Sequence, residues 1–191
     1  MVLQFANGGT LCDYLKTKQE KGIFNISWAE LIRIAIEITD GLKYIHSKSI
    51  IHRDLHSNNI LINDGKAMIN FATSSFSDVH RLAPLIPYAY PQLLSNDQLK
   101  HNEKSDIYSL GVLFWELAIG VPPFQRFPRN TILSEILKGK KEIPIVNAPS
   151  DYISLFQKCW SLNPENRPTL DEISLTLDVF TSRAVNQSGP D

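Results

Sequence analysis

The chain has 191 residues, of which 43% are hydrophobic and 20% are charged. These values are typical of a globular protein and suffice for one domain with a sizeable core. Nineteen lysines and arginines nearly balance twenty aspartates and glutamates. This balance excludes a strong overall field toward nucleic acid or an anionic membrane, so we expect neither of them as a partner.

The cysteines and the lengths of the apolar runs indicate the cellular compartment in which the protein is expected. Cys12 and Cys159 lie far apart in the sequence, which predicts neither a disulfide framework nor a cysteine metal site and is typical of a reducing environment. No apolar run reaches the length needed to cross a bilayer, and the N-terminus lacks the pattern of a signal peptide. We therefore expect a soluble, cytoplasmic protein.

The first residues predict a strand. Residues 1–5 are mostly apolar, and the Asn-Gly-Gly sequence at 7–9 ends the run. A strand at this position would be an unpaired sheet edge. It predicts that a sheet once preceded the chain and is absent here.

Two helix starts follow. Thr10 and Ser27 each stand three residues before an acidic residue, which is the capping-box pattern. In the second helix the apolar residues recur at helical spacing, which predicts a face turned to the core. They are Leu31, Ile34, Ala35, Ile38, Leu42 and Ile45.

A short β region is predicted next, with strands at 50–51, 60–62 and 67–69 and an Asn-Asp-Gly turn at 63–65. The stretch 70–91 is longer than ordinary connections, and loops of that length are usually functional or mobile.

The rest of the chain is predicted to be helical. Residues 105–119 are apolar nearly all the way round, which predicts a central buried helix. Further helices are expected near 131–137 and 152–160 and from Thr169, which begins a third capping box. The polar residues 181–191 predict a disordered tail.

The motif that carries chemistry is His52-Arg53-Asp54-Leu55-His56-Ser57-Asn58-Asn59. It matches the H-R-D-L-x-x-x-N pattern of a catalytic loop and follows a long amphipathic helix. On these residues the chain resembles the C-terminal lobe of a eukaryotic protein kinase. The resemblance implies a mainly α fold with a small β region over residues 1–180, that is, the helical lobe with the N-lobe absent.

Two further segments extend the resemblance. Residues 105–112 resemble the D-x-W-S-x-G start of the buried helix, where the family's aspartate, here Asp106, holds backbone amides of the catalytic loop. Residues 159–168, with Cys-Trp followed by Pro, Arg and Pro, are similar to the C-W-x-x-x-P-x-x-R-P pattern of the tyrosine-kinase and tyrosine-kinase-like branches.

The resemblance assigns roles in phosphoryl transfer. Asp54 would accept the proton of the substrate hydroxyl, and Asn59 would hold a magnesium ion. Arg53 is similar to the residue that pairs with a phosphorylated activation loop. The candidate phosphorylation sites, which equally read as a plain polar loop, are Thr73, Ser74, Ser75 and Ser77.

The resemblance also implies ATP and magnesium as cofactors, and protein partners or a protein substrate. Residues 1–9 are similar to the last N-lobe strand and the hinge, where adenine would meet the backbone around Gln4 and Ala6 above an apolar floor at Leu61. Residues 70–92 would form the activation segment.

The sequence departs from the family most clearly at the second metal position. Asn70-Phe71-Ala72 stands where the family has Asp-Phe-Gly, and a neutral amide is a poor ligand for a hard dication. Asp64 is an alternative ligand, but its position favours a role in the turn.

The sequence departs from the family in three other ways, which concern nucleotide binding, the charge that faces the transferred phosphate, and the end of the predicted activation segment. The 191 residues contain no Gly-rich loop and no phosphate-binding strand lysine, so we expect the roof of the nucleotide site to be missing. His56 and Asn58 replace the family's loop cation. Gln92 replaces the glutamate that pairs with Arg167, leaving at best a neutral hydrogen bond.

Three hypotheses follow. The first is an inactive or severely impaired, pseudokinase-like or truncated module that binds partners. The second is an active Ser/Thr or Tyr kinase that has an N-lobe in a longer gene product. The third is a gene fragment whose apolar surface lies exposed.

Overall fold

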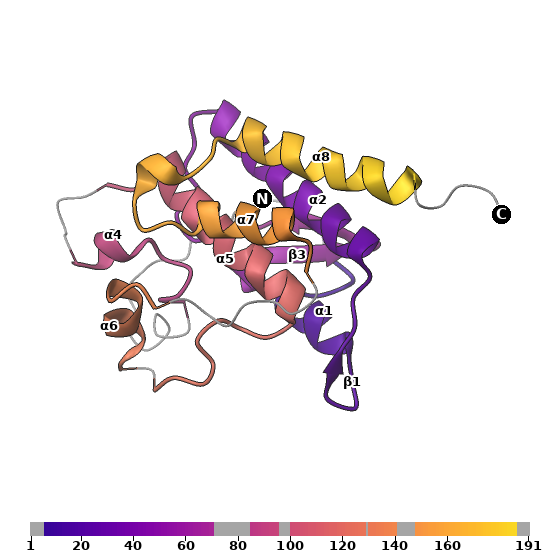
Figure 1. The fold of residues 1–191 in the computed structure, drawn as a ribbon, viewed down its shortest axis with the longest axis horizontal. Helices are drawn as coiled ribbons and strands as arrows, with labels where there is room; N and C mark the ends of the chain where they lie inside the picture. Colours follow the sequence, from indigo (N-terminus) through magenta and orange to yellow (C-terminus); the bar gives the residue numbers. More distant parts are fainter. Residues whose placement is uncertain (1–5, 71–84, 96–99, 129, 141–147, 187–191) are drawn as a thin grey trace.

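The structure, a computed structural model, describes residues 6–70, 85–95, 100–128, 130–140 and 148–186. It is mostly helical with two small sheets, which confirms the mainly α prediction with a small β region (Figure 1). The helices are α1 (Leu11–Thr17), α2 (Trp28–Ser47), α4 (Pro91–Ser95), α5 (Glu103–Ile119), α6 (Ile132–Leu137), α7 (Ser150–Cys159) and α8 (Leu170–Asn186). The strands are β1 (Gln19–Glu20), β2 (Ile23–Phe24), β3 (Ile60–Asn63) and β4 (Lys66–Ile69), and two 3-10 turns are η1 (Ser57–Asn59) and η2 (Pro164–Asn166).

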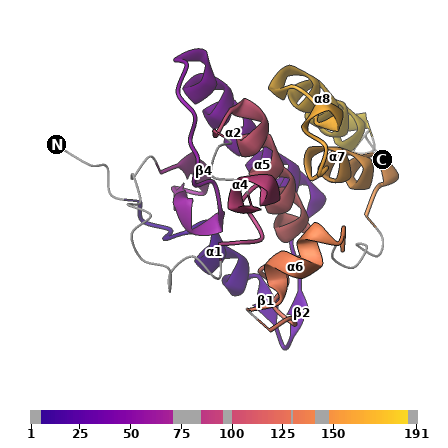
Figure 2. The same ribbon diagram turned by 90° about the vertical axis from the view of Figure 1, so that its left-hand side faces the viewer.

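Helix α5 forms the centre of the domain, as its apolar circumference predicts. All of its residues from 105 to 117 are buried. It packs against α7 on one side and α2 on another, and Figure 2 shows α5 between the α1 and β4 side and the α7 and α8 side. The contact with α7 is close, because a Cβ atom at Gly111 would lie only 2.6 Å from the backbone nitrogen of Trp160.

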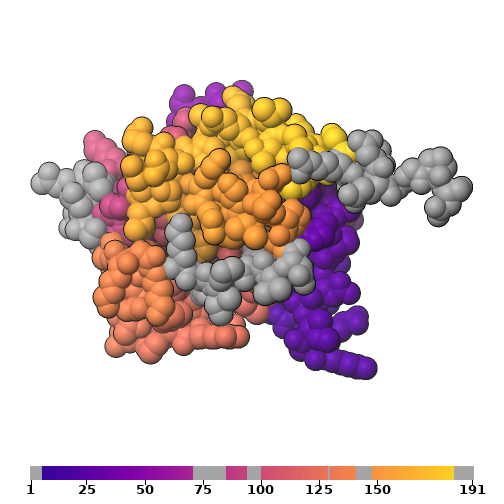
Figure 3. All heavy atoms as spheres, in the orientation of Figure 1, coloured from indigo at the N-terminus to yellow at the C-terminus, as the bar shows by residue number. Residues whose placement is uncertain are grey.

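Helix α2 buries its predicted stripe. The side chains of Leu31, Ile34, Ala35, Ile38 and Leu42 are at most 2% exposed, and Ile45 at the end of the stripe is half-buried. Helix α8 lies along α2, and in the space-filling view α7 and α8 form the outer surface of this face (Figure 3). The stripe therefore faces the core, as predicted.

The three predicted caps start helices, but only one is a complete reciprocal box. The Thr10 and Ser27 hydroxyls accept the amides three residues on, at 3.1 and 3.2 Å. At Thr169 the box is complete, because the Glu172 carboxylate also accepts the Thr169 amide at 2.7 Å. A further box, from Asn102 to Ser105 at the start of α5, was not predicted.

Strands β3 and β4 pair antiparallel as predicted, with Ile60 opposite Ile69 and Asn63 opposite Lys66. Asp64 and Gly65 both have positive φ, 49° and 76°, which suits a two-residue hairpin turn. The strand predicted at 50–51 is wrong. Ile50 instead continues the turn after α2, where its amide donates to the Ile45 carbonyl at 3.3 Å.

Two other differences concern the β1–β2 hairpin and the C-terminal end of α8. The short β1–β2 hairpin was not predicted, since its strands are only two residues long on each side of the Lys21-Gly22 turn. The disordered tail is wrong over 181–186, because α8 continues to Asn186. The hydroxyls of Thr181 and Ser182 bond back to carbonyls one turn earlier, so these polar residues do not end the helix. The strand predicted at 1–5 lies outside the described residues.

None of the helices in the described ranges combines the length and apolar character needed to cross a lipid bilayer.

Candidate active site

The loop 52–59 is held by a buried carboxylate of α5. Asp106, 1% exposed, accepts the backbone amides of His52 at 2.8 Å and Arg53 at 2.9 Å. The ring of His46 at the end of α2 lies 2.8 Å from the same carboxylate. The predicted role of Asp106 in holding the loop amides is confirmed, and this anchor fixes where the loop begins.

The loop brings Asp54 and Asn59 together. The Asn59 amide nitrogen donates to the Asp54 carbonyl at 2.8 Å and to its carboxylate at 3.0 Å. With its nitrogen engaged in this way, Asn59 directs its carbonyl oxygen away from Asp54. That oxygen is the atom that would meet a cation.

His56 lies against Asp54. Its Nδ1 accepts the Asn58 amide at 3.2 Å, and its Nε2 is 3.4 Å from an Asp54 carboxylate oxygen. The same Nε2 is also 3.1 Å from the side-chain amide nitrogen of Asn59. His56 therefore packs against Asp54 and Asn59 and is 6% exposed, unlike a lysine that extends toward a phosphate.

Asn70 directly follows β4 and lies beside the loop. Its backbone amide donates to the Asn59 carbonyl at 2.8 Å. His52 Nδ1 accepts the Asp54 amide at 3.3 Å, so its Nε2 donates to the Asn70 carbonyl, 3.1 Å away. The three polar residues that the sequence singled out, Asp54, Asn59 and Asn70, are thus neighbours in the structure.

The predicted nucleotide floor lies on β3. Residues 8–10 pair with this strand through the Gly8 amide, which donates to the Ile62 carbonyl at 2.8 Å, and through a bridge between Thr10 and Leu61. Ala6 and Leu61 are both half-buried in this region. Gln4, Phe71, Ala72 and the candidate phosphorylation sites lie outside the described residues.

Asp64 is a turn residue. Its carboxylate accepts a hydrogen bond from the side-chain amide nitrogen of Asn7 at 2.7 Å. Its own backbone amide donates to the side-chain oxygen of Asn7 at 3.0 Å. It lies at the opposite end of the β3–β4 hairpin from Asn59 and Asn70, which excludes it from their site.

A mainly apolar pocket of about 250 Å³ adjoins Asp54. One wall is the loop 52–59, including Arg53, whose φ is 71° and whose side chain is exposed. The other wall is the segment 85–93, which contributes Leu85, Ile86, Tyr88, Ala89 and Leu93. The pocket therefore offers a mainly apolar surface next to the carboxylate of Asp54, which suits the binding of an apolar side chain.

A sequence model for protein tyrosine and serine/threonine kinases matches residues 1–177 of this chain. The chain belongs to this protein kinase family. It is 29% identical over 97% of its length to a probable serine/threonine-protein kinase, roco8, of Dictyostelium discoideum, and 28% identical over 94% to the serine/threonine/tyrosine-protein kinase HT1 of Arabidopsis thaliana. It is 25% identical over 94% to the tyrosine-protein kinase Fer of Mus musculus. The chain spans 11%, 47% and 22% of these three proteins.

The residues at the kinase metal positions do not fit a tightly held magnesium ion. Asn59 is the asparagine that the family pattern carries at this place, but Asn70 puts a neutral amide where the family has the aspartate that holds magnesium together with substrate phosphates. The nearby carboxylate of Asp54 is bonded to Asn59 and faces His56.

Arg167 is buried beneath Tyr90. This side chain is 2% exposed and donates to the carbonyls of Ser161, Lys104 and Leu162. Its guanidinium lies 3.9 Å from the centre of the Tyr90 ring, and burial lowers its pKa from the ordinary value. Gln92 donates to the same Leu162 carbonyl at 3.2 Å.

The sequence missed two residues at this site. Tyr90 stands where kinases have alanine, and its stack on Arg167 was not foreseen. The second missed residue is Glu116. It is the one acidic residue in the apolar run 107–119, and this was the signal in the sequence that could have identified it. It is 1% exposed and binds Ser57 and Tyr88.

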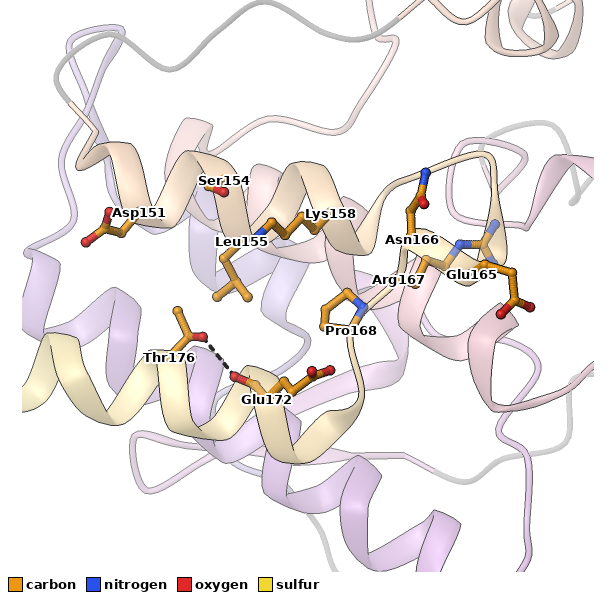
Figure 4. Close-up of a pocket in the computed structure, with 10 residues that line it drawn as sticks. All are labelled: Asp151, Ser154, Leu155, Lys158, Glu165, Asn166, Arg167, Pro168, Glu172 and Thr176. Carbon is orange, nitrogen blue, oxygen red and sulfur yellow. Dashed lines mark hydrogen bonds between the residues drawn. The ribbon is translucent and has the colours of Figure 1, made fainter.

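A larger groove, about 530 Å³, lies between α7 and α8, well apart in sequence from the kinase motif (Figure 4). Asp151 and Lys158 line its α7 side, and Glu172 lines its α8 side. Its charges are mixed in sign, and it contains none of the residues 52–59.

Proposed function

We propose that this chain is the C-terminal lobe of a protein kinase with a weakened magnesium site, and that it acts mainly by binding protein partners. In this proposal residues 1–9 are the last N-lobe strand and hinge, 52–59 the catalytic loop and 70–92 the activation segment. The observation that supports it is that Asn70, which has an amide where the family has the aspartate of Asp-Phe-Gly, is bonded through its backbone to Asn59. The two free thiols, Cys12 and Cys159, support a reducing, cytoplasmic setting.

The apolar pocket beside Asp54 supports the binding role. It combines a preformed loop with a mainly apolar wall, which suits a peptide side chain with or without phosphate transfer.

The test is calorimetric titration of ATP into the chain with and without magnesium. We expect no gain in affinity from magnesium for the natural chain, because neither amide supplies negative charge. Asn70→Asp should gain about tenfold or more in magnesium-dependent affinity. Asn58→Asp is the matched control, since it adds the same charge at an exposed position of the neighbouring loop 52–59 and should gain little. Phosphate transfer from magnesium ATP by the natural chain, abolished by Asp54→Asn, would contradict the proposal.

A second function, an active kinase within a longer protein, is favoured by one observation. The bond from Asn59 to Asp54 is already formed, and so are the bonds by which Asp106 holds the loop amides. In that case Asn70→Asp should raise the rate of phosphate transfer in the full gene product, and no gain in rate would count against it.

A further inference from the structure

Arg167 is a buried cation that has no anionic partner in the described part of the chain. Its side chain is 2% exposed, and its hydrogen bonds go to the backbone carbonyls of Ser161, Lys104 and Leu162. None of the ion pairs formed by the described residues includes it. A guanidinium at such a place needs another source of negative potential to offset its lost hydration.

Two tyrosine rings supply that potential. The guanidinium carbon of Arg167 lies 3.9 Å from the centre of the Tyr90 ring and 5.1 Å from that of Tyr108, and both are cation–π distances. Tyr108 belongs to α5, and its hydroxyl accepts the Trp160 indole nitrogen at 2.9 Å. Tyr90 belongs to the segment 85–93 and is half-buried. One of the two aromatic faces on the cation therefore comes from this segment.

The side chain at position 92 lies beside the same cation but cannot pair with it. Gln92 donates to the Leu162 carbonyl at 3.2 Å, and Arg167 donates to that same carbonyl at 3.2 Å. A neutral amide forms no ion pair with a guanidinium. The direct contact between the segment 85–93 and Arg167 is therefore made by the ring of Tyr90, two residues before the position at which the sequence lacks a glutamate.

Tyr90 is well placed to hold the wall of the pocket beside Asp54. It does not line the pocket itself, but Ala89 directly before it and Leu93 three residues later do. The Leu93 amide donates to the Tyr90 carbonyl at 3.0 Å, where α4 begins. A ring fixed on Arg167 at this position restrains the backbone on both sides of it.

We propose that Tyr90 is a positioning residue whose stack on Arg167 takes the place of the missing ion pair at position 92 and holds the segment 85–93 in place. The departures from the family at positions 90 and 92 are then one compensated change. The inference goes beyond the proposed function, because it concerns how the pocket wall is held. Its test uses no nucleotide, metal or partner, so the two proposals can fail separately.

The first test is hydrogen exchange of the whole chain, followed by mass spectrometry at neutral pH. Tyr90→Leu keeps an apolar side chain but removes the aromatic face, so the segment 85–93 should exchange about threefold faster or more, while α8 is unchanged. Tyr90→Phe keeps the face and should retain the protection. Tyr44→Leu, at a tyrosine of α2 that is 67% exposed, is the matched control and should change nothing in this segment.

Three outcomes of this first test would overturn the proposal. Equal protection in Tyr90→Leu and the natural chain would show that apolar packing suffices. Loss of protection in Tyr90→Phe as well would assign the effect to the hydroxyl. An equal loss of protection in α8 would show that Tyr90 supports the whole core rather than the segment.

The second test is rescue by charge. Adding Gln92→Glu to Tyr90→Leu puts a carboxylate beside Arg167 and should return the protection of the segment 85–93 to within about twofold of the natural chain. Asn166→Glu in the same background is the matched control. It adds the same charge next to Arg167 but outside the segment, so it should restore nothing. If Gln92→Glu failed to restore protection, or if Asn166→Glu restored as much, the ring would not stand in for an ion pair.

Discussion

The backbone amide of Asn70 donates to the carbonyl oxygen of Asn59 over 2.8 Å. This bond closes the end of the β3–β4 hairpin next to the loop 52–59, so the backbone around the proposed metal site is already formed. What differs is the side chain at position 70, where an amide replaces a carboxylate. The change in chemistry can therefore be tested by one substitution, without rebuilding the surrounding backbone.

Asp106→Ala should destabilise the protein strongly. The substitution leaves the buried amide of His52 and the part-buried amide of Arg53 without their acceptor, and each unsatisfied buried group costs about 1–3 kcal/mol. We expect a loss of about 3 kcal/mol in the free energy of unfolding, measured in urea. Asp40→Ala, an exposed aspartate of α2, should change it by less than about 0.5 kcal/mol. Equal effects of the two substitutions would contradict the anchoring role.

Two helix glycines should respond differently to alanine. At Gly111 a Cβ would lie 2.6 Å from the Trp160 backbone nitrogen and 2.7 Å from the Cys159 Cβ, so α7 must move. At Gly41 it would lie 3.2 Å from the end of the Ile69 side chain, which can shift. We expect Gly111→Ala to cost roughly 2–3 kcal/mol in thermal or urea unfolding and Gly41→Ala to be within about 1 kcal/mol of neutral. A stable Gly111→Ala would show that the α5–α7 contact is looser than described.

Glu116→Gln should alter how stability depends on pH. The folded pKa of Glu116 is raised from 4.5 to about 7, so its contribution to stability is present below about pH 4.5 and is lost as pH rises through about 7. This loss corresponds to about 3 kcal/mol. The variant lacks it, so its free energy of unfolding relative to the natural chain should increase between pH 5 and pH 8. Parallel pH profiles in urea unfolding would exclude a raised pKa.

Arg167→Lys should be destabilising although it keeps the charge. The guanidinium donates to three carbonyls and stacks on Tyr90, and an ammonium on a flexible stem cannot reproduce that geometry. We expect a loss of about 2–3 kcal/mol in the free energy of unfolding. Arg33→Lys, in a partly exposed pair with Glu37, should cost less than about 1 kcal/mol. If both substitutions changed the free energy of unfolding by less than about 1 kcal/mol, only the charge would matter at Arg167.

The sequence foresaw those features that depend on neighbours along the chain. The capping residues, the apolar stripe of α2 and the Asp64-Gly65 turn act within a few positions, so their patterns predict helix starts, a buried face and a hairpin. The motif at 52–59 likewise carries the kinase resemblance in consecutive residues. The strand at 50–51 failed for the opposite reason, since two apolar residues form a strand only if another strand lies beside them.

Contacts between distant residues were decided by the tertiary structure. By itself the sequence determined the family, most of the helices and the identity of the side chains at Asp54, Asn59 and Asn70. Only the fold decided that the Asn70 backbone is bonded to Asn59. It also decided that Glu116 on α5 accepts hydrogen bonds from both Ser57 and Tyr88. The physical reason is that burial and hydrogen bonding of a side chain depend on which helices pack around it, and local sequence periodicity does not specify that packing.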